Sequence, residues 1–235
     1  MVKLTCNIDT KYDMFIIEGY NMITEFVEKI AQFNNFENVE NQYSNNFKYN
    51  IITRNNLIQY MKIMLKMKPA TILIGEAPGY NGCRWSGVPF TAEKNILIEY
   101  RKGQLFGITN GFKIRDIAKP QSEASATIVW EHLRKIDSYP LMWNAFPFHP
   151  HKKNNTESNR KPSNEELHTG KLILSEILKM YNINNIIALG NTAQETLAKI
   201  GITCNKIRHP ANGGKNEFIS GLNTELGILP SNAST

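Results

Sequence analysis

Cysteine is scarce in this 235-residue sequence, which holds only Cys6, Cys83 and Cys204. The three lie far apart and include no Cys-x-x-Cys pair, so the sequence indicates neither a disulfide framework nor a zinc or iron–sulfur site. His149 and His151 lack a third ligand at a recognisable spacing, and we expect both to contact solvent or phosphate. We therefore predict no metal, no cofactor and a reducing, cytoplasmic location.

Long hydrophobic runs are missing as well. Apolar stretches such as residues 14–17, 72–74 and 186–189 are far shorter than the roughly 18 residues that a membrane-spanning helix needs. The first residues reach Asp9 before any long apolar stretch, which argues against a secretory signal. These absences exclude membrane-spanning proteins and disulfide-rich secreted domains.

The composition is that of a folded, moderately basic protein. Hydrophobic residues make up 41% of the chain, which is enough for a sizeable core in one large domain or a domain with an extension. The 27 Lys and Arg against 21 Asp and Glu give a formal net charge of +6. This surplus permits a polyanionic partner without proving one.

Residues 1–68 differ from the remainder of the chain. Residues 20–33 and 55–67 have helical apolar spacing, and we interpret the Asn-rich segment between them as a polar loop without an Asn-specific function. We predict a mainly helical N-terminal extension over residues 1–68, followed by the main domain over residues 69–235.

The main domain alternates short apolar strands with longer amphipathic segments, the pattern of a parallel sheet with helical crossovers. Ser163 and Glu166 form a capping box that opens a helix over residues 164–181, and Asn191 caps a helix that Gly201 terminates. We predict an α/β protein, a three-layer α/β/α domain with a central four-stranded parallel sheet. The strands are expected at residues 71–74, 140–144, 185–189 and about 203–207.

Ligands bind at the carboxyl ends of the strands in such sheets, so we expect the functional residues in the loops that follow the strands. The three loops have the sequences GEAPGYNGCRWSGVPF, NAFPFHPHKKNN and RHPANGGKN. Glu76 in the first loop can orient a water or stabilise a developing cation. Phe90 offers a face for a planar ligand, the Asn144 amide suits the edge of a base, and neutral His209 can donate to an anionic leaving group. Each residue taken alone is more often, or as often, structural.

Cations flank these loops. They suit a groove that follows a nucleic-acid backbone, although a solvated surface explains them too. Helix N-termini after Leu189 and after Pro210 add backbone donors for phosphates. The cations are Lys152, Lys153, Arg160, Lys161, Lys206, Arg208 and Lys215.

Taken together, the motifs resemble the uracil-DNA glycosylase superfamily. Residues 75–79, Gly-Glu-Ala-Pro-Gly, resemble its first motif in the form carried by the iron–sulfur members, and Gly-Val-Pro-Phe at 87–90 resembles the segment with the stacking phenylalanine. Asn144 matches the base-reading asparagine, and His209-Pro210 matches the second catalytic motif. Residues 159–162 with Glu165 and Glu166, and residues 188–193, match two further segments, so the resemblance spans about residues 69–221.

The resemblance implies a monofunctional enzyme that flips deoxyuridine out of DNA and cuts its N-glycosidic bond, leaving an abasic site. It implies that the protein acts on DNA containing uracil or another deaminated base. We expect a monomer, the default for an enzyme that holds one flipped nucleotide, and the short apolar runs predict no membrane partner. By that likeness Glu76 and His209 are catalytic, while Ala77, Phe90, Asn144 and Tyr80 bind the base. The residues placed on the DNA backbone are Thr192, Arg160, Lys161, Arg208, Asn212 and Lys215.

The sequence departs from the family pattern at several positions. The iron–sulfur members use four cysteines, which this chain does not have, so we predict no cluster and interpret Cys83 as a plain loop residue. Gly79 stands where the best-known uracil enzymes carry a tyrosine that blocks the methyl group of thymine, so Tyr80 or Glu76 has to exclude thymine instead. Ala211 replaces a serine that relatives often carry. The loop at residues 212–215 offers no large apolar wedge.

Three alternatives to uracil removal stay open. The first is a glycosylase for hypoxanthine, xanthine or thymine opposite guanine, which the space left by Gly79 favours. The second is a damaged-DNA-binding protein without catalysis, against which Glu76 and His209 both argue. The third is hydrolysis of free nucleotides, which needs no basic groove.

Overall fold

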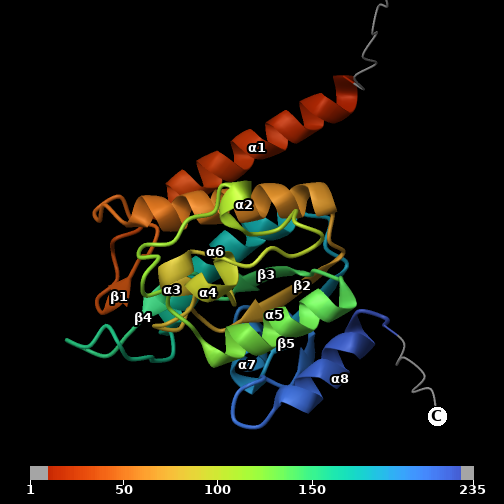
Figure 1. Ribbon diagram of the computed structural model, residues 1–235. Coiled ribbons are helices and arrows are strands. Elements are labelled where there is room, and N and C mark those ends of the chain that lie inside the picture. The colour runs from red at the N-terminus through yellow and green to blue at the C-terminus, as the bar shows by residue number, and fades with distance from the viewer. Residues whose placement is uncertain (1–9, 229–235) are drawn as a thin grey trace, which may run out of the picture.

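The computed structural model describes residues 10–228, so the expectation for Cys6 lies outside them (Figure 1). Short strands in the middle of the molecule are surrounded by helices. In chain order the elements are α1 (Thr10–Ala31), β1 (Val39–Glu40), α2 (Asn50–Met67), β2 (Thr71–Gly75), α3 (Cys83–Ser86), α4 (Glu93–Ile96), η1 (Ile108–Asn110), α5 (Ala124–Ile136), β3 (Leu141–Asn144), β4 (His149–Pro150), α6 (Asn164–Met180), β5 (Asn185–Leu189), α7 (Asn191–Lys199), β6 (Asn205–Ile207) and α8 (Lys215–Glu225).

Four strands form a parallel sheet in the order β3-β2-β5-β6. Gly75 at the end of β2 pairs with Asn144 at the end of β3, and Leu189 at the end of β5 pairs with Ile207 at the end of β6. Because all four strands run in the same direction, their carboxyl ends meet at one edge. The predicted α/β fold and its four strands are confirmed.

Helices cover both faces of the sheet (Figure 1). On one face α1 packs on α2, and Lys29 of α1 forms a 2.5 Å ion pair with Glu176 of α6. On the other face a 2.7 Å hydrogen bond between His132 and Asn223 joins α5 to α8. The predicted three-layer arrangement is confirmed.

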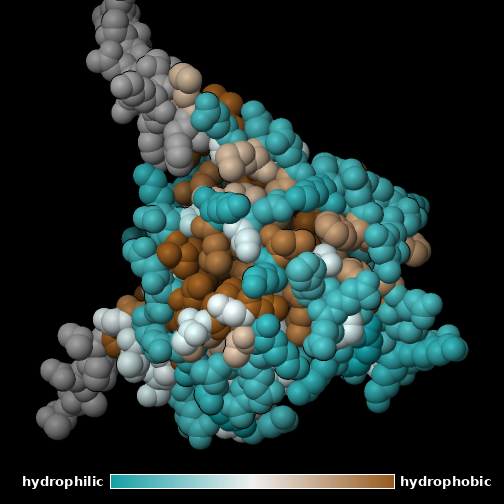
Figure 2. Space-filling view, turned by 180° about the vertical axis from the view of Figure 1, so that it is seen from behind, coloured by the Kyte–Doolittle hydropathy of each residue, from teal (hydrophilic) through white to brown (hydrophobic). Residues whose placement is uncertain are grey.

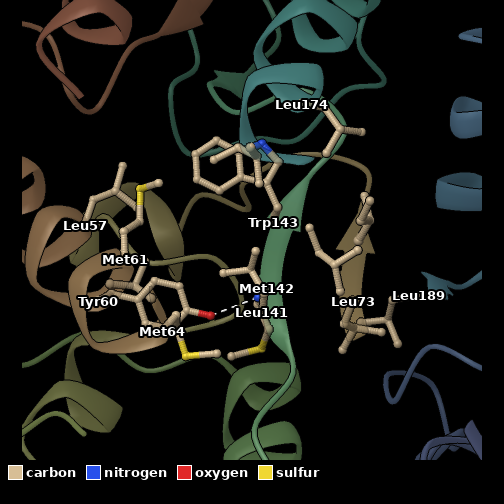
Figure 3. Close-up of a cluster of buried hydrophobic side chains, with 14 of the residues drawn as sticks. Leu57, Tyr60, Met61, Met64, Leu73, Leu141, Met142, Trp143, Leu174 and Leu189 are labelled. Atoms are coloured by element: carbon tan, nitrogen blue, oxygen red, sulfur yellow. Dashed lines mark hydrogen bonds between the residues drawn. The ribbon is translucent and has the colours of Figure 1, made fainter. Parts of the chain in front are cut away.

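The core joins α2 to the edge of the sheet (Figure 3). Leu57, Tyr60 and Met61 of α2 are buried toward β3, which is an outer strand of the sheet. The Met142 N–H of this strand donates a 2.9 Å hydrogen bond to the hydroxyl of Tyr60, so α2 supplies a partner that a missing neighbouring strand would otherwise provide. The boundary expected after residue 68 therefore falls between two elements that share one core.

The Asn-rich segment has structural functions that the sequence interpretation did not assign. The Asn41 amide donates to the carbonyl oxygens of Ile30 at 2.8 Å and Phe33 at 2.9 Å, and thereby holds the end of α1. Asn50 is also buried, and its amide donates to the Asn41 carbonyl at 3.2 Å. Buried backbone oxygens need such partners, so these asparagines hold the loop against the domain.

Local differences from the prediction concern element ends. Helices α1 and α2 begin earlier than expected, at residues 10 and 50, and the short antiparallel pair of β1 with β4 was not predicted. The capping box of α6 is confirmed, since the Ser163 N–H donates to the Glu166 carboxylate at 2.7 Å. The predicted cap of α7 is wrong by one residue. Gly190, with φ +88°, is the N-cap, and Asn191 begins the helix.

No helix among residues 10–228 is long and apolar enough to cross a membrane. Figure 2 shows the face turned away from the viewer in Figure 1, where hydrophobic side chains gather in the middle and hydrophilic ones surround them. Large apolar side chains that are exposed include Met14, Ile17 and Met22 of α1 and Leu172 of α6.

Candidate active site

The three loops named from the sequence converge at the carboxyl edge of the sheet. The Ala145 N–H donates to the Gly75 carbonyl at 2.8 Å and joins the first loop to the second, and the Gly190 N–H donates to the Ile207 carbonyl at 2.9 Å where β5 and β6 end. A cavity of about 660 Å³ opens where they meet, which is large enough for a nucleobase and part of its sugar. The residues predicted for the site from the sequence that line this cavity are Glu76, Ala77, Phe90, Asn144, Thr192, Arg208 and His209.

Gly75 brings two of these side chains together. A Cβ atom at this position would lie 2.6 Å from the Phe90 ring and 2.7 Å from Oδ1 of Asn144, so only glycine leaves both groups where they are. Asn144 is 4% exposed, and no residue in the described part of the chain bonds its side-chain amide. A buried amide that faces a cavity in this way is available to a ligand.

Phe90 is held in an unusual backbone conformation. Its φ of +54° is rare for a residue with a bulky side chain and costs energy. Strained backbone conformations of this kind are common at functional sites. The indole N–H of buried Trp130 donates to the Phe90 carbonyl at 3.0 Å and fixes this conformation. The ring therefore lies over Gly75 as a fixed flat wall of the cavity.

Glu76 is a half-buried carboxylate in the first turn after β2. Burial raises its pKa above the ordinary value of 4.5, while nearby Lys161 opposes the shift and Glu195 adds to it. Its backbone carbonyl accepts a 3.0 Å hydrogen bond from Phe146, so the residue is fixed between the first two loops. A partly desolvated carboxylate on a fixed backbone can accept a proton from water or stabilise a cation.

The ring of His209 is present as one particular tautomer. The Ala211 N–H donates to Nδ1 at 3.1 Å, so Nδ1 carries no proton and the neutral ring has its N–H at Nε2. Burial, with the charge of Arg208 adding to it, lowers the pKa of His209 below its ordinary value of 6.5. The neutral form, a hydrogen-bond donor through Nε2, therefore persists at neutral pH.

Replacing Gly75 by alanine is expected to lower the rate of the reaction by a factor of about 10 to 10². The reason is that small displacements of the groups that position a substrate are costly. The new methyl group would crowd Phe90 and Asn144, and both would have to move. Single-turnover rates measure the effect. Melting temperature checks the fold, since Gly75 has no positive φ to strain. An unchanged rate would contradict the close packing of Phe90 and Asn144 against Gly75.

Several predicted DNA-contacting residues lie outside the cavity lining. Lys161 is exposed, but it lies close enough to Glu76 for its charge to oppose the rise in the pKa of Glu76. Asn212 has φ +52° and is exposed, and Lys215 forms an exposed 3.7 Å ion pair with Glu131. None of these three residues belongs to the cavity lining.

Arg160 requires a correction. Its guanidinium forms a two-bond ion pair with buried Glu166, at 2.8 and 2.6 Å, and donates to the backbone oxygens of His151 and Asn38 at 3.0 and 3.2 Å. The Glu166 partnership further raises the pKa of Arg160. The side chain joins α6 to the N-terminal segment, so it has no donor left for the DNA phosphate that the sequence assigned to it.

The expected solvent or phosphate contacts of the histidine pair are wrong. His149 is fully buried, and its two ring nitrogens lie 2.9 Å from the carbonyl oxygens of Pro78 and Thr156. His151 is 9% exposed and stacks on His149. No cluster of three or more possible metal ligands occurs within the described residues. The pair therefore fixes the second loop against the first.

Two residues of the first loop also differ from their predicted surroundings. Tyr80 does not belong to the cavity lining, and its backbone carbonyl accepts a 2.8 Å hydrogen bond from Trp85. Cys83 is not a plain loop residue, because it begins α3, is buried and lines the cavity. Burial raises the pKa of its thiol to about 12.

Some lining residues were missed from the sequence. Glu123 and Ser125 come from the start of α5, far from any strand end, and only a helix-start pattern after Pro120 marked that segment. Asn159 lines the cavity and accepts a 3.2 Å hydrogen bond from the Tyr80 N–H, which links the first and second loops. Asn191 also lines the cavity, as does Lys206, one of the cations that the sequence placed beside these loops.

Comparisons with known proteins agree with this geometry. The sequence model described as the uracil DNA glycosylase superfamily matches residues 64–232. The crystal structure of wild-type SMUG2 from Pedobacter heparinus is similar in fold, with a TM-score of 0.60 and 15% sequence identity, and the match covers 89% of this chain and 97% of that one. A search among curated proteins found no match.

Proposed function

The chain belongs to the uracil-DNA glycosylase superfamily, whose members are DNA glycosylases, and from this premise we propose that it removes uracil from DNA. The observation that carries the proposal is one cavity that holds the half-buried carboxylate of Glu76, the neutral imidazole of His209, the Phe90 ring and the unbonded amide of Asn144. Together these groups match what hydrolysis of a nucleoside requires.

Recognition begins with a flipped nucleotide. Moving a base out of the helix costs a few kcal/mol, least for a mispaired base such as uracil opposite guanine. In our proposal the Phe90 ring stacks on the base, and the Asn144 amide pairs with O4 and N3–H of uracil through its donor and its acceptor. Because the Trp130 indole holds the Phe90 backbone and the Asn144 side chain is buried, little ordering remains to be done on binding.

Cleavage follows from the positions of the two remaining groups. As the bond between C1′ and N1 breaks, the electron pair moves into the uracil ring and positive charge develops on the sugar. Nε2–H of His209 donates to O2 of the departing anion, and Glu76 stabilises the sugar cation and receives a proton from the attacking water. The products are free uracil, protonated on nitrogen by solvent, and an abasic site.

The DNA backbone is proposed to lie along the rim of the cavity. The N-terminus of α7 supplies backbone N–H groups and the hydroxyl of Thr192, and exposed Lys161, Arg208 and Lys215 supply positive charge. In the loop at residues 212–215, Asn212 is the residue proposed to contact the DNA strand. One enzyme molecule suffices for one flipped nucleotide, so a monomer is proposed.

The test uses end-labelled oligonucleotides with one uracil, hypoxanthine, xanthine or thymine, single-stranded and opposite each base. Alkali breaks the strand wherever a base has been removed. We expect strand breaks at uracil, most of all opposite guanine, and binding that weakens as salt rises because phosphate contacts release counterions. Breaks only at another lesion would replace uracil as the substrate. Binding of damaged DNA with no breaks would contradict the catalytic proposal.

A further inference from the structure

A second, smaller pocket lies between the segment that joins α1 to α2 and the loop that follows β4. These two segments lie side by side where β1 pairs with β4 (Figure 1). The volume of the pocket is about 320 Å³, within the range of small ligand sites. The proposed mechanism uses none of its residues. The lining includes Phe36, Phe47, Phe148, His151 and Thr156.

One buried ring separates this pocket from the candidate active site. Nδ1 of His149 lies 2.9 Å from the carbonyl oxygen of Pro78, which lines the active-site cavity. Nε2 of the same ring lies 2.9 Å from the carbonyl oxygen of Thr156, which lines the second pocket. Because only an imidazole ring lies between these two oxygens, one DNA strand can reach both sites.

Aromatic rings form the apolar part of the pocket. Phe36 is half-buried, and its ring is held edge-on against the buried ring of Phe146, with centroids 5.8 Å apart. Phe47 is 64% exposed, so its ring lies where the pocket opens to solvent. Every nucleobase has a flat face that stacks on rings of this kind, whatever the sequence.

A buried polar group without a partner also faces the pocket. His151 is 9% exposed, and Nδ1 of its ring lies 2.9 Å from the Lys152 carbonyl oxygen. In the neutral ring Nδ1 therefore carries the proton and Nε2 is an acceptor. No residue among those that the structure describes donates to Nε2, and the atom is not closed off from solvent. Because the ring lines the pocket, Nε2 is available to an N–H group of a ligand, which every nucleobase offers.

The charges around the pocket suit a polyanion. Exposed Lys48 comes directly after Phe47, and exposed Lys152 and Lys153 come directly after His151. The acid in the lining, Glu40, has its charge paired with Arg84 at 2.6 Å. Aromatic rings with flanking cations are the usual means of binding single-stranded nucleic acid, because the rings hold bases and the cations hold phosphates.

We propose that the second pocket binds an unpaired base of a single-stranded DNA segment. The base stacks on the phenylalanine rings, and one of its N–H groups donates to Nε2 of His151. A base inside a duplex is stacked and paired, so only a base that has left the helix can enter. The inference goes beyond the proposed function and shares with it only the DNA partner.

The test measures dissociation constants of the full-length protein for three uracil-free DNAs. They are a single strand, a strand of the same length made of abasic sites, and the duplex. Phe47→Ala is expected to weaken binding of the normal single strand about tenfold, the usual loss for one base stacked on an aromatic ring. Binding of the abasic strand and of the duplex should not change, because neither offers an unpaired base.

Two further variants make the comparison specific. Phe47→Tyr keeps the ring and should bind the single strand as the parent does. Tyr49→Ala is the matched control, because Tyr49 is an exposed ring nearby that does not line the pocket. Melting temperatures check the fold, and the exposure of Phe47 predicts no loss of stability.

His151→Phe tests the polar contact. It keeps a ring stacked on His149 but has no acceptor, so binding of the normal strand should weaken by roughly three- to tenfold, with no change on the abasic strand. A melting temperature equal to that of the parent shows that the buried ring is still in place.

The inference would be overturned by parent-like binding of the single strand in Phe47→Ala, by an equal loss on the abasic strand, or by an equal loss in Tyr49→Ala. The proposed function would stand after any of these results if the parent removes uracil. A parent that removes no uracil but shows the expected pattern of binding would overturn the proposed function and support the second site.

Discussion

Glu76→Gln is expected to lower the single-turnover rate of uracil removal by about 10²- to 10⁴-fold, the range for losing a positioned acid–base group. The amide keeps the shape of the side chain, but it cannot accept a proton from water and carries no charge to stabilise the sugar cation. Because Asn144 and Phe90 are untouched, binding of uracil-containing DNA is expected to remain. The measurements are single-turnover cleavage and a binding titration on the same oligonucleotide.

The stability of this variant separates a chemical effect from unfolding. The folded protein raises the pKa of Glu76, so it binds that proton more tightly than the unfolded chain does. Ionised Glu76 therefore destabilises the fold above its folded pKa, and this cost disappears below its unfolded pKa of about 4.3. Glu76→Gln should melt no lower than the parent at neutral pH, with the difference closing near pH 4. Glu25→Gln is the control for rate, and full activity of Glu76→Gln would refute the role of the carboxylate.

His209→Ala is expected to lower the same rate by about 10²- to 10³-fold, the usual cost of one donor to a developing anion. The donor is Nε2–H, because Nδ1 is already engaged by the Ala211 N–H. The comparison variant is His168→Ala, which removes an exposed histidine of α6 and should leave the rate unchanged. Equal rates for the two variants would contradict the assignment of His209.

The pH dependence gives a second measure of the same pair. Activity needs ionised Glu76 and neutral His209, so kcat/KM should fall as pH decreases through their pKa values. Burial lowers the pKa of His209 from its ordinary 6.5 and raises the pKa of Glu76 from its ordinary 4.5, so the two protonations move toward each other on the pH scale. In His209→Ala the remaining decrease should follow one proton instead of two.

The sequence was sufficient for the features that repeat along a strand or end at one. Apolar runs located the four strands within a residue or two, and parallel strands bring their carboxyl ends to one edge, so Glu76, Asn144 and His209 were predicted to meet. The roles of these residues in catalysis stay predictions until the enzyme is assayed.

The sequence did not predict the hydrogen bonds and ion pairs that polar side chains make with distant parts of the chain. Nothing near Arg160 signals that its donors are taken by Glu166 and by backbone oxygens of the N-terminal segment, because those partners depend on the packing of α6. The burial of His149 depends likewise on its hydrogen-bond partners. Pro78 is distant from it in the sequence, and Thr156 lies on a loop. Glu123 reaches the cavity from a helix start, where no periodic pattern points to a ligand.

The convergence of the loops at one edge also bears on synthesis of the protein. Glu76 follows the first strand of the sheet in chain order and His209 follows the last, so β6 enters the sheet only after residue 207 has been made. Contacts of such long sequence separation form late, because a long loop must first be closed. A nascent or truncated chain that ends before residue 209 can hold the first two loops but lacks the imidazole. Newly made protein is therefore expected to remove no base until β6 and the loop that carries His209 are in place.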